Sequence, residues 1–282
     1  MYPQESGRAL IMRFSPTEFD IVDCHTHVYP PKIAAKAAQN IGDFYELPAR
    51  CRGGVEELLE DGKKYGINNY LVCSAATTPA QVSFINKFIR DACREHTEFI
   101  GFGTMHPDCD AEAETRAIAE YGLHGIKLHP DFQRFYIDAP EAYPIYEHAS
   151  AHGLPILFHI GDNRYSFSEP ERLNRVLNDF PRLQVIAAHL GGYHVWDTDR
   201  SFLKRDNVWF DCSSTLALIG PEATAEEIRR MGVEKVFFGT DFPLWDYDEE
   251  IARFFELPMS RSEYEAILAG NFRAFLKAQT VR

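Results

Sequence analysis

The stretch FDIVDCHTH, residues 19–27, begins the pattern that decides the fold of this chain. Its apolar start predicts a strand over residues 19–23, and two histidines follow almost at once. Side chains two residues apart on an extended backbone point to the same side, so His25 and His27 can direct their imidazoles at one point. Two such imidazoles are half of a transition-metal site. A His-x-His pair alone is a weak indication, so the hypothesis depends on what the rest of the chain adds.

From this strand onward, short β-branched or aromatic runs alternate with longer stretches of helical period. The predicted strands cover residues 19–23, 69–73, 99–104, 125–128, 155–159, 184–188, 208–211 and 235–238. The predicted helices cover residues 55–65, 79–95, 111–121, 141–152, 170–178, 221–231 and 261–279. The first strand is expected to lead into a long, irregular connection that contains Pro30, Pro31 and Pro48.

This alternation predicts a parallel sheet covered by helices, and eight strand–helix units are the number that closes a barrel. A doubly wound open sheet is the alternative, but the G-x-G-x-x-G loop that usually follows an early strand of that fold is absent from the sequence. We therefore predict a single (β/α)8 TIM-barrel domain over residues 1–282, with its core at about 19–279 and a short N-terminal arm.

The composition and charge of the chain exclude several classes of partner and location. The 282 residues are 45% hydrophobic and carry a formal net charge of -13, which argues against nucleic acid and anionic membranes as partners. The six cysteines are scattered without a Cys-x-x-Cys pair, as is typical of thiols kept reduced in a cytosol. No apolar run approaches the ~20 residues of a membrane span, and the N-terminal segment has no signal-peptide core. We expect a cytoplasmic protein.

Chemistry-bearing side chains collect at the C-terminal ends of the predicted strands, where the active sites of such barrels lie. These residues are His25, His27, Lys127, His129, His159, His189 and Asp241. Each alone is an ordinary rim or core residue more often than a functional one. Five of the chain's eleven histidines fall at these few positions, however, and together they indicate a metal site.

The ordered set resembles the amidohydrolase superfamily, in particular the amidohydrolase-related branch that includes aminocarboxymuconate-semialdehyde decarboxylase and the resorcylate decarboxylases. The segments that carry the resemblance are DCHTH (23–27), GIKLHP (125–130), LFHIGD (157–162), VIAAHLGG (185–192) and VFFGTDFP (236–243).

The resemblance implies that a divalent metal is bound by His25, His27, His159 and Asp241. Zn²⁺ is the expected ion, with Mn²⁺ or Fe²⁺ as alternatives, and one ion is favoured over two. It also implies that His189 is a further ligand or orients the attacking water or the substrate.

The chemistry of these groups suggests roles for them. A metal with an open position lowers the pKa of bound water to about 7, and Asp241 can then act as general base and acid. His189 can donate to an oxygen on which charge builds. In the two-metal members of the superfamily that the chain resembles, a lysine of the fourth strand carries a carbamate that bridges both ions, and the resemblance allows this role for Lys127; alternatively, its ammonium group holds a substrate carboxylate. Asp23 either orients a ligand or makes an ordinary hydrogen bond at the strand end.

Substrate contacts are expected mainly from the long loop after the fourth strand, because a loop of this length is more often a functional rim than a tight connection. The candidates are His129, Asp131, Gln133 and Arg134. Tyr193 and Trp245 are expected to form aromatic walls or, with equal weight, to pack between loops.

Three functions are consistent with the sequence. The first is a metal-dependent hydrolase of an amide, ester or lactone in a small molecule. This hypothesis predicts that Asp241→Asn loses activity in protein with full metal occupancy. The second is a non-oxidative decarboxylase or hydratase of an unsaturated or aromatic carboxylic acid, with Lys127, Arg134 or Arg164 pairing the carboxylate. The third is a non-catalytic metal-binding barrel. We favour hydrolysis, because it is the commonest use of this metal set, and expect a carboxylate or carbonyl substrate and a homo-oligomer.

Overall fold

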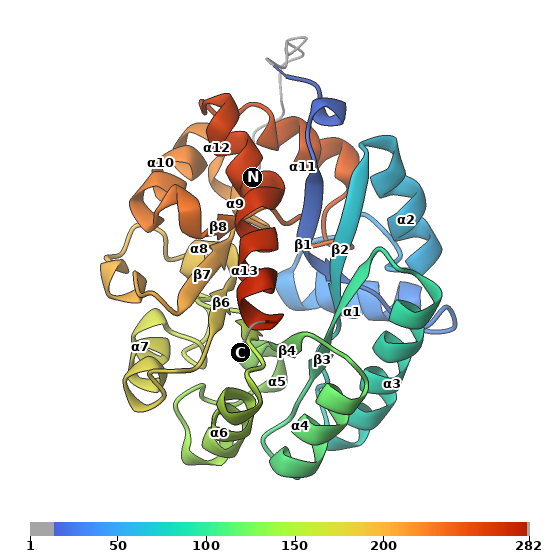
Figure 1. Cartoon of the computed structure of the whole chain (residues 1–282), viewed down its shortest axis with the longest axis vertical. Coiled ribbons are helices and arrows are strands. Elements are labelled where there is room, and N and C mark those ends of the chain that lie inside the picture. The colour runs from blue at the N-terminus through green and yellow to red at the C-terminus, as the bar shows by residue number, and fades with distance from the viewer. Residues whose placement is uncertain (1–13, 281–282) are drawn as a thin grey trace.

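The computed structural model describes residues 14–280, which form an eight-stranded parallel barrel with helices around it (Figure 1). Consecutive strands are hydrogen-bonded neighbours in the order β1 to β8. Their bounds are β1 Ile21–His27, β2 Ile67–Cys73, β3 Phe99–Thr104, β4 Gly125–Leu128, β5 Ile156–Phe158, β6 Val185–Ala187, β7 Val208–Asp211 and β8 Val236–Phe237. The predicted TIM barrel is confirmed. The predicted N-terminal arm falls mostly on residues 1–13, outside the described residues.

The barrel closes where β1 meets the segment that follows β8. The amide of Cys24 donates to the carbonyl of Phe238 at 2.9 Å, and that of His27 donates to Phe242 at 2.7 Å. In the other direction, the amide of Asp241 donates to the carbonyl of His25 at 2.9 Å. The backbone therefore places Asp241 beside the two histidines of β1.

The seven predicted helices occur, the last of them divided into three segments, and the helix over residues 247–254 is one that was not predicted. Their bounds are α2 Val55–Lys64, α3 Pro79–Glu95, α4 Ala111–Glu120, α6 Tyr143–His152, α7 Pro170–Asp179, α10 Pro221–Met231, α11 Tyr247–Phe254, α12 Arg261–Glu265 and α13 Asn271–Thr280. A π-helical segment, Ala266–Gly270, joins the last two, and short helices occur at α5 Pro130–Gln133, α8 Ala188–Gly191 and α9 Thr215–Ile219. Four 3-10 turns complete the described elements, at Pro16–Glu18, Pro140–Ala142, Ser201–Leu203 and Val233–Lys235. None of the helices within residues 14–280 has the length and apolar character that a membrane crossing requires.

The interior of the barrel is a separate apolar cluster that includes Val22, Leu157 and Phe237. Phe272 and Phe275 of α13 belong to the same cluster, so this helix covers one end of the barrel. Burial of such side chains is the main favourable contribution to folding.

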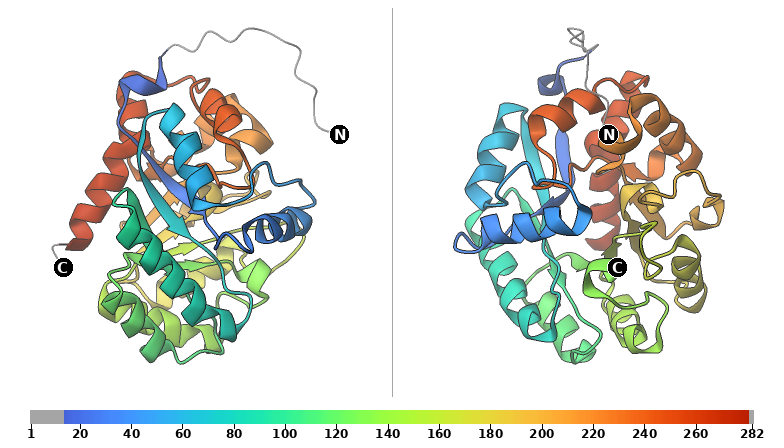
Figure 2. Two further views of the ribbon diagram at one scale, coloured as in Figure 1. Left: turned by 90° about the vertical axis from the view of Figure 1, so that its right-hand side faces the viewer. Right: turned by 180° about the vertical axis from the view of Figure 1, so that it is seen from behind.

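Helix α1, Ala34–Tyr45, corrects the prediction of an irregular connection after the first strand. Its alanine-rich start, AAKAAQ, favours a helix strongly, and Pro30 and Pro31 lie just before it, where they do not interrupt it. Figure 2 shows α1 and α13 on opposite sides of the molecule. The helix that sequence reasoning missed therefore lies over the end of the barrel at which β1 finishes.

Candidate active site

A bulge in β1 presents the two histidines. The pairing passes from Asp23↔Tyr70 to Thr26↔Val72, so β1 advances three residues while β2 advances two. Bulges of this kind re-aim side chains and are common beside active sites. The Nε2 atoms of His25 and His27 lie 3.2 Å apart. Both rings are buried, and the two nitrogens face the same point.

Asp241 completes a group of three ligand atoms. Its Oδ1 atom lies 3.6 Å from His25 Nε2 and 3.4 Å from His27 Nε2. Metal–ligand bonds of about 2.1 Å at octahedral to tetrahedral angles separate neighbouring ligand atoms by about 3.0–3.4 Å. Two of the three separations fall within this range and the third, 3.6 Å, is slightly longer, so the three atoms can hold one divalent ion. Burial raises the pKa of the Asp241 carboxyl, but the adjacent His25 and His27 rings outweigh it and hold the pKa well below its usual range.

Two residues beyond this group orient His25, and sequence reasoning missed both. Asp211 Oδ2 lies 3.1 Å from His25 Nδ1, and Ser213 Oγ lies 3.0 Å from the same nitrogen. Because a carboxylate only accepts, His25 donates from Nδ1, which leaves the Nε2 lone pair free for a metal. Burial, with Lys127 nearby, lowers the pKa of His25 to about 4, so the ring is neutral. The available signal was that Asp211 ends β7, as the predicted ligands end other strands.

Asp23 does not orient either histidine ring. Its carboxylate accepts hydrogen bonds from Thr240 Oγ1 at 2.6 Å and from the hydroxyl of Tyr247 at 2.7 Å. It therefore ties β1 to the segment after β8 and to α11, which is the strand-end alternative that the sequence left open.

His159, the fourth predicted ligand, lies with a second set of rings. Its Nδ1 atom is 3.1 Å from His189 Nε2, and its ring stacks on that of His129 with centroids 4.0 Å apart. His189 Nδ1 lies 2.9 Å from the carbonyl oxygen of Ser213. The structure thus brings His25, His27 and Asp241 together and places His159 and His189 side by side as a neighbouring pair.

Tyr45 of α1 was also missed, because its helix was expected to be a loop. Its hydroxyl lies 2.6 Å from His129 Nε2 and 3.3 Å from His159 Nδ1. This residue joins the covering helix to the histidines at the ends of β4 and β5.

Lys127 lies between the two sets. It is buried, and its Nζ atom is 2.9 Å from His25 Nε2. Burial lowers the pKa of this ammonium group. No carboxylate within residues 14–280 forms an ion pair with this ammonium group, so it can take one from a ligand.

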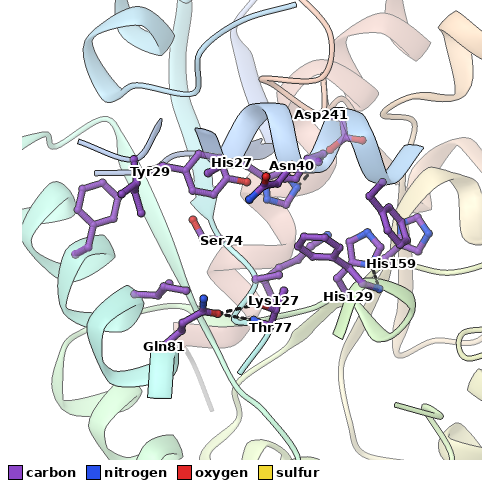
Figure 3. Close-up of a pocket in the computed structure, with 18 of the residues that line it drawn as sticks. His27, Tyr29, Asn40, Ser74, Thr77, Gln81, Lys127, His129, His159 and Asp241 are labelled. Atoms are coloured by element: carbon purple, nitrogen blue, oxygen red, sulfur yellow. Dashed lines mark hydrogen bonds and ion pairs between the residues drawn. The ribbon is translucent and has the colours of Figure 1, made fainter. Parts of the chain in front are cut away.

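These groups line one cavity of about 170 Å³. In Figure 3, His27 and Asp241 lie along one side of it, His129 and His159 along another, and Ser74, Thr77 and Gln81 on the side of α3. A cavity of about 150 Å³ holds a benzene molecule in a protein core. The cavity therefore has room for a single ring, and a longer ligand would extend from it past the exposed Ile33 and Phe84.

Of the predicted loop residues, only His129 lines this cavity. Gln133 instead donates to the carbonyls of Ala76 and Met105 at 2.7 and 2.8 Å. The carboxylate of Asp131 accepts a short hydrogen bond from Ser168, and Arg134 is exposed. Asp131 lies behind His159, with its Oδ2 atom 3.9 Å from Nε2 of that ring, and none of the three side chains lines the cavity.

The two predicted aromatic walls pack between loops. Tyr193 is buried with its ring centroid 5.3 Å from those of both His159 and His189, and it is outside the cavity lining. Trp245 donates from Nε1 to Ser214 Oγ at 2.9 Å, and Ser214 in turn donates to Asp241 Oδ2 at 2.7 Å. Trp245 thus orients the Ser214 hydroxyl that donates to the Asp241 carboxylate.

The chain was compared with protein families, with curated sequences and with solved structures. The family model described as amidohydrolase matches residues 22–278. No curated protein sequence gives a significant match. Among solved structures, the 5-carboxyvanillate decarboxylase of Sphingomonas paucimobilis superposes with a TM-score of 0.74 at 16% identity, over 92% of this chain and 99% of that one.

Two further structures are decarboxylases of the same fold. The dihydroxybenzoic acid decarboxylase of Polaromonas sp. JS666, with bound manganese and the inhibitor 2-nitroresorcinol, gives a TM-score of 0.72 at 16% identity, over 92% and 97% of the chains. A 2,6-dihydroxybenzoate decarboxylase in complex with 2,6-dihydroxybenzoate gives a TM-score of 0.72 at 18% identity, over 92% and 99%. At these identities the likeness establishes the fold.

The prediction that this barrel is a hydrolase is wrong by this comparison, because these neighbours are decarboxylases. The physical reason is that the ligand set does not select the reaction. A metal held by imidazoles and a carboxylate can polarise a substrate oxygen as readily as it activates water.

Proposed function

The chain belongs to the amidohydrolase family, and on that premise we propose that it is a metal-dependent, non-oxidative decarboxylase of a small aromatic or unsaturated carboxylic acid. It would be a lyase acting without an oxidant. One observation carries the proposal: three metal-ligand atoms and the buried Lys127 ammonium group lie together in a cavity sized for one ring. The decarboxylase structures that share the barrel support it.

We assign the metal to His25, His27 and Asp241, with His159 as the fourth ligand from the adjoining wall. Mn²⁺ is proposed ahead of Zn²⁺, because manganese is bound in one of the similar structures. When bound, the divalent ion would act as a Lewis acid on a substrate oxygen. We keep one ion rather than two, and Lys127 as an unmodified side chain.

The substrate carboxylate is assigned to Lys127. Of the three cations considered from the sequence, Arg134 is exposed, and Arg164 is already paired with Asp162, its Nη2 atom 2.7 Å from a carboxylate oxygen. Lys127 alone among them lines the cavity. Its compact charge can hold the carboxylate without fixing it in one orientation.

The reaction replaces a carboxylate by a proton. The carbon that bears the carboxylate takes a proton, the C–C bond breaks, its electron pair returns to the π system, and CO₂ leaves. We assign proton delivery to His189 as an imidazolium: its Nδ1 donates to the carbonyl of Ser213, so the proton it transfers is the one on Nε2, the nitrogen that lies 3.1 Å from His159 Nδ1. Asp241, with its low pKa, is a ligand rather than the general base that hydrolysis would need.

The test is turnover of a panel of benzoic acids, including 2,6-dihydroxybenzoate and 5-carboxyvanillate, by Mn²⁺-loaded protein in D₂O. We expect CO₂ release and one deuterium at the carbon that lost the carboxylate. His189→Gln should abolish turnover, whereas His194→Gln, an exposed histidine outside the cavity lining, should not. A product with a new hydroxyl group, or hydrolysis of esters with no CO₂ from any acid, would refute the proposal.

We also propose a cytoplasmic location, since the six cysteines are all free thiols. A homo-oligomer and the absence of a nucleic-acid partner stay predictions from the sequence.

A further inference from the structure

Helix α3 carries two apolar stripes. One of them, which includes Val82, Ile89 and Ala92, is buried against the barrel. The other consists of Phe84, Ile85 and Phe88, and it lines the cavity described above. Ile85 and Phe88 pack partly against the core, but the outer end of this stripe is left uncovered and can take a further apolar partner. Its outermost member, Phe84, is 58% exposed.

A matching stripe approaches from α1 and the residue before it. It consists of Ile33, Ala37, Ile41 and Phe44, which are spaced four, four and three residues apart and so share one face. All four line the same cavity as the second stripe of α3. Ile33 is 47% exposed, so it and Phe84 mark the outer end of the cavity.

The polar residue next to the α3 stripe is already engaged. Gln81 accepts hydrogen bonds at its amide oxygen from the amide and hydroxyl groups of Thr77, at 2.8 and 3.0 Å (Figure 3). The outer part of the cavity therefore offers a ligand mainly carbon surface, whereas the inner part offers histidines and Lys127.

We propose that the substrate carries an apolar substituent, an alkyl or aryl group, at the end remote from its carboxylate. The inference rests on the proposed decarboxylation at the same site, with the carboxylate at Lys127 and one ring in the enclosed volume. The substituent then lies between the α1 and α3 stripes and covers Ile33 and Phe84. Each methylene removed from water there should strengthen binding about fourfold.

The space between the two stripes is assigned to part of the substrate rather than to a second copy of the chain, because the stripes and the metal-ligand residues line the same cavity. The same cavity that is lined by Ile33 and Phe84 is lined by His27, Lys127 and Asp241. A molecule that is anchored at the inner end and reaches Ile33 and Phe84 lies between the two stripes.

The experiment measures binding and does not depend on turnover. Mn²⁺-loaded protein is titrated by calorimetry with benzoate, 4-ethylbenzoate and 4-butylbenzoate. We expect the butyl compound to bind about fifteenfold more tightly than the ethyl compound. Phe84→Ala should reduce this ratio to about threefold or less. The matched control is Tyr136→Ala, since Tyr136 is 43% exposed but lies outside the cavity lining, and it should leave the ratio unchanged.

A flat series, or a ratio that Phe84→Ala leaves intact, would overturn the inference. So would a flat series in which Phe84→Ala converts a dimer into a monomer in sedimentation, because a second copy would then cover the stripes. If the binding series behaves as expected while no acid releases CO₂, the proposed function fails and the preference for an apolar-substituted acid stands.

Discussion

Replacement of Asp211 by asparagine should weaken metal binding although Asp211 is not a predicted ligand. Its Oδ1 atom accepts from the amide and hydroxyl of Ser213, at 3.1 and 2.5 Å, and from the amide of His189 at 3.2 Å. Three donors at this position will select the oxygen of an asparagine, so its NH₂ group will face His25 Nδ1. The imidazole must then accept at Nδ1 and carry its proton on Nε2, the atom that faces His27 and Asp241.

Loss of such a supporting carboxylate typically lowers metal affinity 10–100-fold, or about 1.4–2.7 kcal/mol. We expect a loss of Mn²⁺ affinity at or above the upper end of this range for Asp211→Asn, because a proton on Nε2 of His25 blocks the lone pair that would bind the metal. The assay is calorimetric titration of Mn²⁺ into metal-free protein. Asp23→Asn is the matched control, since Asp23 is also a buried strand carboxylate but bonds Thr240 and Tyr247 instead of a histidine ring. Equal affinities for the two variants, or an unchanged affinity in Asp211→Asn, would refute the reasoning.

Three other predictions concern single side chains. Lys127→Met should weaken binding of a benzoate inhibitor about tenfold or more, because the ammonium group that pairs with its carboxylate is lost. The affinity for Mn²⁺ should be unchanged or rise, since the ammonium group 2.9 Å from His25 Nε2 no longer competes with the metal. A fall from two bound ions to one per chain would instead identify a bridging lysine. Ser214→Ala removes the hydroxyl that donates to Asp241 Oδ2 and should lower kcat/KM about tenfold or more, measured beside the melting temperature; unchanged kinetics would contradict the supporting role. Burial raises the pKa of Glu250 from 4.5 to about 7, so the folded protein binds more protons than the unfolded chain and stability should fall as pH rises through this window. Glu250→Gln should reduce the loss of unfolding free energy between pH 5 and pH 8 by about 2–3 kcal/mol in urea titrations, and an identical loss in both proteins would count against the raised pKa.

The fold was predictable because each strand is a short apolar run set between helical periods. All eight strands occur where expected, although β8 is only Val236–Phe237. Helix α1 was missed because the prolines around it were given more weight than its run of alanines. That error concealed the part of the cavity wall that α1 supplies.

The candidate site was predictable to the extent that it lies at strand ends. His25, His27 and Asp241 meet because β1 and the segment after β8 are neighbours at the closure of the barrel, and the bulge in β1, which the sequence does not predict, presents the two histidines. Asp131 and Arg134 lie outside the cavity lining, because their directions depend on α5 and on the left-handed backbone of Arg134, with φ of 62°, which the sequence pattern does not predict. The reaction was beyond the sequence, because the same ligands serve both hydrolysis and decarboxylation.

The seam between β1 and the segment after β8 has a consequence for how the protein is made. The hydrogen bond from the amide of Asp241 to the carbonyl of His25 joins the beginning of the barrel to its end. A nascent chain therefore cannot assemble the three-ligand group until almost all of it has left the ribosome, and this contact of high sequence separation forms late. A metal bound by these three residues would bind only the closed barrel and would therefore stabilise the contact between β1 and the segment after β8. Metal-free protein should open first between β1 and β8.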